Sequence, residues 1–216
     1  MKKLVSLVLA LIMTTALLTV GANAWDDDEK NHYLDDCKKL TTEEYKVFYA
    51  NFGPNKESFQ PAGKLTRGYG CRIGTYLALG MKDANALPKA ASFSDVTDAT
   101  TYCAHIKWCM DKGIVSGYGD GTYAPAKNLS RDAFLKIVLG ALGYKAEEQG
   151  YNKAETWRWE VLSDAQAIGL LNGVEISNVV EIRRDEAAKI VVNALMATPV
   201  GGTEPLYKTV YPALLG

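Results

Sequence analysis

The middle of the chain carries apolar residues at the spacing of α-helices, interrupted by a polar segment that is rich in turn-forming residues. This pattern predicts one helix over residues 101–112 and a second helix that starts after Ser130, a preferred N-cap residue. Between them, Asp120-Gly121 favours a turn. The segment is therefore predicted to form a helix-loop-helix unit. Its apolar positions are Tyr102, Ile106, Cys109 and Met110 in the first helix and Phe134, Leu135, Val138, Leu139 and Leu142 in the second.

A single helix-loop-helix unit cannot bury its own apolar stripes, and the sequence contains further copies of it. Residues 53–67 (GPNKESFQPAGKLTR) align without a gap on residues 117–131 (GYGDGTYAPAKNLSR) at an offset of 64. Residues 181–195 (EIRRDEAAKIVVNAL) align on residues 128–142 at an offset of 53. The pattern therefore predicts three stacked repeats that share one core. An arginine recurs at each predicted helix start, namely Arg67, Arg131 and Arg184.

These motifs resemble the S-layer homology (SLH) family. The second copy carries FSDV, the loop GYGDGTYAP and the helix start LSRDAF, whereas the first copy lacks the acidic residue after Arg67 and the third has a loop three residues shorter. The resemblance implies an all-α, pseudo-threefold spindle of three helix-loop-helix prongs, with the first helices bundled centrally and grooves between the prongs. It divides the chain into repeats at residues 31–82, 93–145 and 151–198 and a C-terminal tail at residues 201–216.

Residues 1–24 have the pattern of a signal peptide. Lys2 and Lys3 precede an apolar run that is too short and too often interrupted by threonine for a membrane anchor, and Ala22-Asn23-Ala24 is typical of a cleavage site. We therefore expect an exported protein with no membrane span after cleavage. The resemblance implies the cell wall or cell surface of a bacterium. The formal net charge is −1, so the chain has no basic field for nucleic acid.

Export permits disulfides among the four cysteines, which are Cys37, Cys71, Cys103 and Cys109. If Cys103 and Cys109 lie on one helix, they are about 9 Å apart along its axis, too far for a bond to each other. Cross-pairing of these two with Cys37 and Cys71, or a single Cys37–Cys71 bond, remains open.

The repeated arginine is unusual at a helix start, because a cation there opposes the positive end of the helix dipole. An anion beside it would use both the guanidinium and the free N–H groups, and a carboxylate such as a pyruvyl ketal suits the planar arginine fork. The alternative is an internal partner, for which Asp95, Asp132 and Asp185 are candidates. We expect exposed arginines whose removal weakens binding and leaves folding intact.

The SLH resemblance implies docking onto an acidic cell-wall polysaccharide of bacteria, with the motif arginines lining the grooves. The second repeat alone combines the full loop, a capping hydroxyl, the arginine and an acidic residue beside it, so its groove is expected to carry most of the affinity. Tyr118 is a candidate for stacking on a sugar, while Tyr123 and Phe59 are expected to anchor loops. The candidate ligand-binding residues are Arg131, Asp132, Ser130, Gly117, Tyr118, Arg67, Thr66 and Arg184.

Little of the chain lies outside the repeats, and residues 25–30 and 201–216 are too short to hold an active site of their own. His105 and Cys109 share a helix face, but with His32 as the second histidine, core packing is the better interpretation, and we assign no metal and no cofactor. The sequence predicts a non-catalytic wall-binding module. The alternative is a degenerate spindle that serves as a structural or protein-interaction unit, with a surface-layer protein as its candidate partner.

Overall fold

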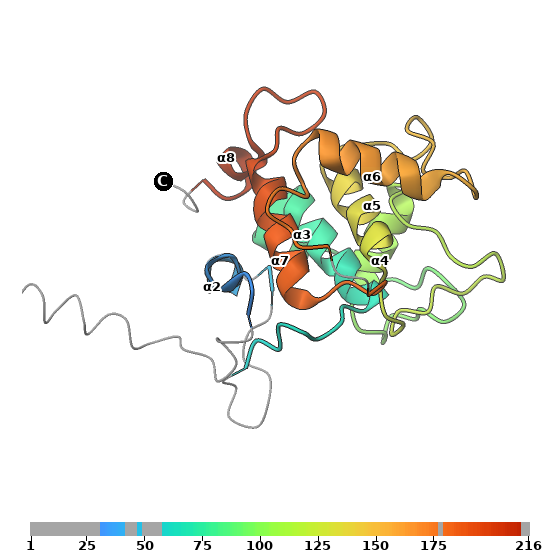
Figure 1. Cartoon of the computed structure of the whole chain (residues 1–216). Helices are drawn as coiled ribbons and strands as arrows, with labels where there is room; N and C mark the ends of the chain where they lie inside the picture. The colour runs from blue at the N-terminus through green and yellow to red at the C-terminus, as the bar shows by residue number, and fades with distance from the viewer. Residues whose placement is uncertain (1–30, 42–46, 49–57, 177–178, 213–216) are drawn as a thin grey trace, which may run out of the picture.

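A computed structural model describes residues 31–41, 47–48, 58–176 and 179–212 (Figure 1). The predicted signal peptide lies outside these residues. In the described part, β-structure is limited to isolated bridges, and no helix is long and apolar enough to span a membrane. The predicted all-α fold is confirmed. The helices are α2 (Leu34–Thr41), α3 (Arg67–Asn85), α4 (Cys103–Asp111), α5 (Arg131–Ala141), α6 (Trp157–Ala167), α7 (Arg184–Met196) and α8 (Leu206–Val210).

The three repeated arginines are the first residues of α3, α5 and α7, as the alignment predicts. Local capping explains why the helices begin there. Thr66 Oγ1 and Ser130 Oγ each accept a hydrogen bond at 3.3 Å from the backbone N–H three residues further on. At α7, where Arg183 replaces the hydroxyl, the Glu186 carboxylate instead accepts from Arg183 N at 3.0 Å.

Backbone hydrogen bonds join the three repeats in a closed ring just before these helix starts. Leu65 N donates to Ile182 O (3.3 Å), Ile182 N donates to Leu129 O (3.0 Å), and Leu129 N donates to Leu65 O (2.8 Å). The ring relates three aligned positions by approximate threefold symmetry. A second ring runs in the opposite direction, with bonds of 2.9 Å from Arg67 N to Lys127 O, from Arg131 N to Val180 O and from Arg184 N to Gly63 O.

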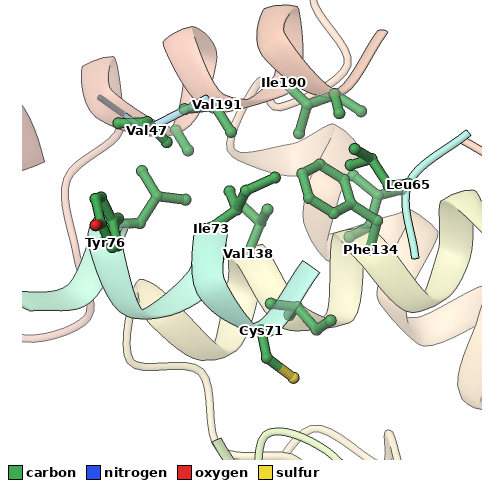
Figure 2. Packing of buried hydrophobic residues seen from close by; sticks show 14 of the residues in the cluster. Val47, Leu65, Cys71, Ile73, Tyr76, Phe134, Val138, Ile190 and Val191 are labelled. Carbon is green, nitrogen blue, oxygen red and sulfur yellow. The ribbon is translucent and has the colours of Figure 1, made fainter. Parts of the chain in front are cut away.

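The second helix of each repeat packs against the first helix of another repeat, so that α3 meets α4, α5 meets α6 and α7 meets α2 (Figure 1). α5 also contacts α3 and α7. Figure 2 shows Ile73 of α3, Val138 of α5 and Val191 of α7 gathered in one core. The second helices therefore occupy the centre, and the expectation of centrally bundled first helices is wrong. α5 and α7 bury more of their residues than α4 and α6 do, which favours the central position for them.

Two glycines of α3 set how closely α5 approaches it. A Cβ on Gly70 would lie 2.5 Å from Leu129 Cδ2, and a Cβ on Gly74 would lie 2.6 Å from Ile137 Cγ2. Either contact is far shorter than van der Waals separation. The glycines thus bring the start of α3, with Arg67, close to the side chains of the second repeat.

The four cysteines are buried free thiols, so neither of the disulfide arrangements that the sequence leaves open is formed in this structure. Cys71 Sγ lies 2.9 Å from Tyr123 OH, and Cys109 Sγ lies 3.6 Å from the carbonyl oxygen of Cys71. These side chains pack the contact between α3, α4 and the loop of the second repeat.

Candidate functional site

The three motif arginines start equivalent helices but have different surroundings. Arg131 is 8% exposed and Arg184 is 4% exposed, whereas Arg67 is only half-buried. The expectation that all three are exposed is therefore wrong for two of them. Of the three, Arg67 is the most exposed.

Backbone carbonyls and aromatic rings of the second repeat hold the Arg67 side chain. Arg67 Nε donates to Tyr123 O at 2.8 Å, and Nη2 donates to Ser116 O at 3.2 Å. The guanidinium carbon lies 4.3 Å from the centroid of the Tyr123 ring and 4.9 Å from that of Tyr118. These contacts fix the arginine against the loop, and the two hydrogen bonds use two of its five donors.

A cavity of about 600 Å³ opens beside Arg67. Its walls come from all three predicted repeats, since α3 supplies Arg67, the second repeat supplies its loop and α5, and the segment before α6 closes the far side. No aspartate or glutamate is among its lining residues. The remaining lining residues are Gly113, Ile114, Val115, Ser116, Gly117, Tyr118, Tyr123, Leu129, Ala133, Lys136, Ile137, Tyr151, Asn152, Ala154 and Trp157.

Lys136 is the second cation of this cavity and was not among the predicted site residues. Its Nζ donates to Tyr151 O at 3.0 Å and to Asn152 Oδ1 at 3.3 Å, and it lies 5.9 Å from the centroid of the Trp157 ring. Burial lowers the pKa of Lys136. The sequence could have indicated this residue, because Lys136 aligns with Lys189 of the third copy at the offset of 53.

The aromatic residues of the second loop have separate roles. Tyr123 is 1% exposed, and its ring stacks on Phe93 with centroids 5.1 Å apart, so it anchors the loop as expected. Phe59 at the aligned position is also fully buried. Tyr118 is 44% exposed at the cavity wall, and its ring centroid lies 4.9 Å from the guanidinium carbon of Arg67 and 5.0 Å from Lys127 Nζ.

The structure divides the predicted site residues among three places. Arg67, Gly117 and Tyr118 line the large cavity. Thr66 and Arg184 line a second cavity of about 260 Å³. The remaining three are at the start of α5. Ser130 caps the helix, and Asp132 Oδ2 lies 3.8 Å from Arg158 Nε. Arg131 contacts Glu186 of the third repeat.

The internal partner of Arg131 is a carboxylate that the sequence analysis did not consider. Arg131 Nη2 donates to Glu186 Oε1 at 2.8 Å, and Glu186 is 2% exposed. Of the candidates considered, Asp95 instead accepts from the backbone N–H groups of Tyr123 and Ala124, and these bonds lower its pKa. The ion pair spans 55 residues of sequence, so local spacing did not reveal it.

Arg184 contacts the first repeat in the same way that Arg67 contacts the second, through a backbone carbonyl and an aromatic ring. Its Nε donates to Phe59 O at 2.9 Å, and its guanidinium carbon lies 4.7 Å from the centroid of the Phe59 ring. Phe59 aligns with Tyr123, so the two arginines make equivalent contacts. The motif arginine thus connects neighbouring repeats in addition to any role in binding.

Residues 92–135 match the family model of the S-layer homology domain, so the resemblance seen in the sequence is confirmed. The chain is 25% identical over 170 residues to "Cell surface glycoprotein 1" of Acetivibrio thermocellus, a match that covers 71% of this chain and 7% of the relative. It is 27% identical over 121 residues to "Surface-layer 125 kDa protein" of Lysinibacillus sphaericus, a match that covers 51% of this chain and 10% of the relative.

A third relative, "Cell surface protein" of Thermoanaerobacter kivui, is 29% identical over 133 residues, covering 59% of this chain and 16% of the relative. The matches thus span less than a fifth of the length of these relatives. The comparisons identify the chain as a module of the bacterial cell surface.

Proposed function

We propose that the chain is a non-catalytic module that binds acidic cell-wall polysaccharide of bacteria in the cavity beside Arg67. The observation that carries this proposal is the composition of the cavity wall. Two cations, Arg67 and Lys136, lie among four aromatic residues, and no acidic residue lines the cavity. Such a wall attracts a ligand that combines a negative charge with the apolar face of a ring.

The donors of both cations support a carboxylate ligand. The hydrogen bonds of Arg67 to Tyr123 O and Ser116 O use two of its five donors, and those of Lys136 use two of its three. A sugar carboxylate, such as a pyruvyl ketal, would accept from the remaining donors and form charge-assisted bonds. Its charge would also compensate for the burial that disfavours the charged form of Lys136.

The size of the cavity suits a short stretch of polymer. A volume of about 600 Å³ falls within the range of about 300–1,000 Å³ that is usual for small-molecule sites. The cavity takes its walls from the proposed repeats at residues 31–82, 93–145 and 151–198. In this proposal the three repeats form one binding unit, and none of them holds the ligand alone.

A second function, a structural or protein-interaction unit, is supported by the other two motif arginines. Arg131 and Arg184 are buried in contacts between repeats, so the repeated motif also serves assembly of the fold. In this alternative the module recognises a surface-layer protein and needs no sugar.

Sedimentation with purified cell-wall sacculi separates the two functions. We expect the protein to sediment with intact sacculi and to remain in solution after the wall polysaccharide has been removed by acid extraction. Arg67→Ala should weaken binding by about 1.5–3 kcal/mol, or roughly 10- to 150-fold, the range for a hydrogen bond to a charged group.

Lys145→Ala is the matched control, because the Lys145 side chain is 74% exposed and does not line the cavity. This variant should bind as the unchanged protein does. Equal binding to extracted and intact sacculi, or full binding by Arg67→Ala, would support the alternative.

A further inference from the structure

One aligned position differs among the three repeats in a way that explains the different surroundings of the arginines. It is the third residue of the second helix, which is Tyr69 in α3, Ala133 in α5 and Glu186 in α7. Tyr69 and Glu186 each contact the motif arginine of another repeat, and Ala133 lines the same cavity as one. The pairs are Arg184 with Tyr69, Arg67 with Ala133 and Arg131 with Glu186.

Where the position holds alanine, the space next to the arginine is open. Ala133 and Arg67 line the same 600 Å³ cavity, and Lys136 lies one turn of helix further on. The methyl group of Ala133 carries no charge and fills little volume. The cationic wall is therefore left for a ligand.

Where the position holds glutamate, the arginine already has an anion. Glu186 Oε1 lies 2.8 Å from Arg131 Nη2, and the two side chains are 3% and 9% exposed. The carboxylate occupies the place at which a ligand carboxylate would meet the guanidinium. A ligand at this arginine would have to displace a buried ion pair, which is costly.

Where the position holds tyrosine, aromatic packing narrows the space, and Tyr69 lines the second cavity together with Lys64 and Arg184. Tyr69 is 6% exposed, and its ring centroid lies 5.6 Å from that of Tyr102 and 6.1 Å from that of Phe48. Arg72, which aligns with Lys136, is 2% exposed, and its guanidinium carbon lies 4.0 Å from the Tyr76 ring. The cavity on this side is accordingly smaller, at about 260 Å³.

We infer that the third residue of each second helix decides which motif arginine accepts an acidic ligand, and that Ala133 leaves Arg67 as the one motif arginine whose cavity has room for it. The inference rests on the proposed function and adds the number of sites and the residue that selects among them. One polymer residue then binds per chain, although the arginine occurs three times.

Titration calorimetry with the methyl glycoside of a pyruvylated N-acetylhexosamine tests this assignment, with the methyl ester of the same compound as the neutral control. The unchanged protein should bind one glycoside per chain and bind the ester more weakly. Ala133→Glu places at Arg67 the carboxylate that Glu186 offers to Arg131. It should reduce affinity by at least ~30-fold, as expected when an internal anion competes for the same cation.

Ala133→Gln is the matched variant, because glutamine has the size of glutamate without its charge. It should lose no more than ~5-fold in affinity, the loss from added bulk alone. Equal losses in the two variants, or no loss in Ala133→Glu, would overturn the inference. Circular dichroism before each titration ensures that a loss is not unfolding.

Glu186→Ala tests the same rule in the opposite direction. Removal of this carboxylate should free Arg131 and raise the number of sites from one toward two, and Glu186→Gln, which removes the charge and keeps the bulk, should do so more weakly. If Glu186→Ala does not fold, the comparison of Ala133→Glu with Ala133→Gln still tests the inference. A stoichiometry of two or three for the unchanged protein would overturn the inference and leave the proposed function intact. Absence of any binding by the unchanged protein would overturn both.

Discussion

Replacement of Arg131 by alanine should destabilise the fold, although the residue stands at a helix start where surface arginines usually contribute little. The substitution removes the partner of Glu186 and leaves a carboxylate that is 2% exposed without its cation. It also removes the side-chain bond from Arg131 Nη2 to Val179 O at 3.3 Å. The third repeat then loses this side-chain link to α5, while the links of Lys136 and Asp132 to it remain.

The size of the effect follows from the burial of the pair. Breaking a buried ion pair by removing one partner typically costs about 3–5 kcal/mol. We expect the lower end, about 3 kcal/mol, because Glu186 keeps its second hydrogen bond, from Arg183 N at 3.0 Å. For a chain of this length, that loss corresponds to a decrease in melting temperature of about 6–12 °C.

Guanidinium chloride denaturation of Arg131→Ala, Glu186→Ala and the double variant measures this loss. The double variant should be more stable than the sum of the single losses implies, by more than about 1 kcal/mol, because the second substitution removes an already unpaired charge. Arg158→Ala, at an exposed arginine, should change the free energy of unfolding by no more than about 0.5 kcal/mol. A loss below about 1 kcal/mol for Arg131→Ala would refute the structural role assigned to this pair.

Two further predictions concern titration and thiol chemistry. Burial and the nearby charge of Arg72 lower the pKa of His105 from 6.5 to about 4. Between these pH values the unfolded chain binds more protons than the folded protein does. The free energy of unfolding should therefore fall as the pH decreases from 6.5 to about 4. The loss should be about 1–2 kcal/mol, allowing for the partial exposure of the ring, and a pH profile of unfolding that is unchanged in His105→Gln would contradict it. Burial also raises the pKa of Cys37 to about 12 and that of Cys109 well above its usual value. Both thiols should therefore react with iodoacetamide at pH 8 only after denaturation, and labelling of either within minutes in the native protein would show that the site opens.

The sequence by itself determined where the second helices begin and that their first residues are equivalent. A capping hydroxyl at Thr66 or Ser130 and the helical spacing of the apolar residues are local features, and each acts within a few residues of chain. The repeat offsets also aligned Arg67, Arg131 and Arg184 correctly, because an ungapped alignment preserves the position of a residue within its helix.

Only the tertiary structure decided which arginine faces an open cavity. Arg67 contacts Tyr123 across 56 residues of sequence, and Arg131 contacts Glu186 across 55. Such contacts depend on how the second helix of one repeat docks against another repeat, which no local pattern specifies. The same docking placed Lys136 in the wall of the cavity that Arg67 lines and buried Arg131 against a carboxylate. Aligned residues therefore have the same local conformation, while the neighbouring repeat determines whether each of them is buried or accessible.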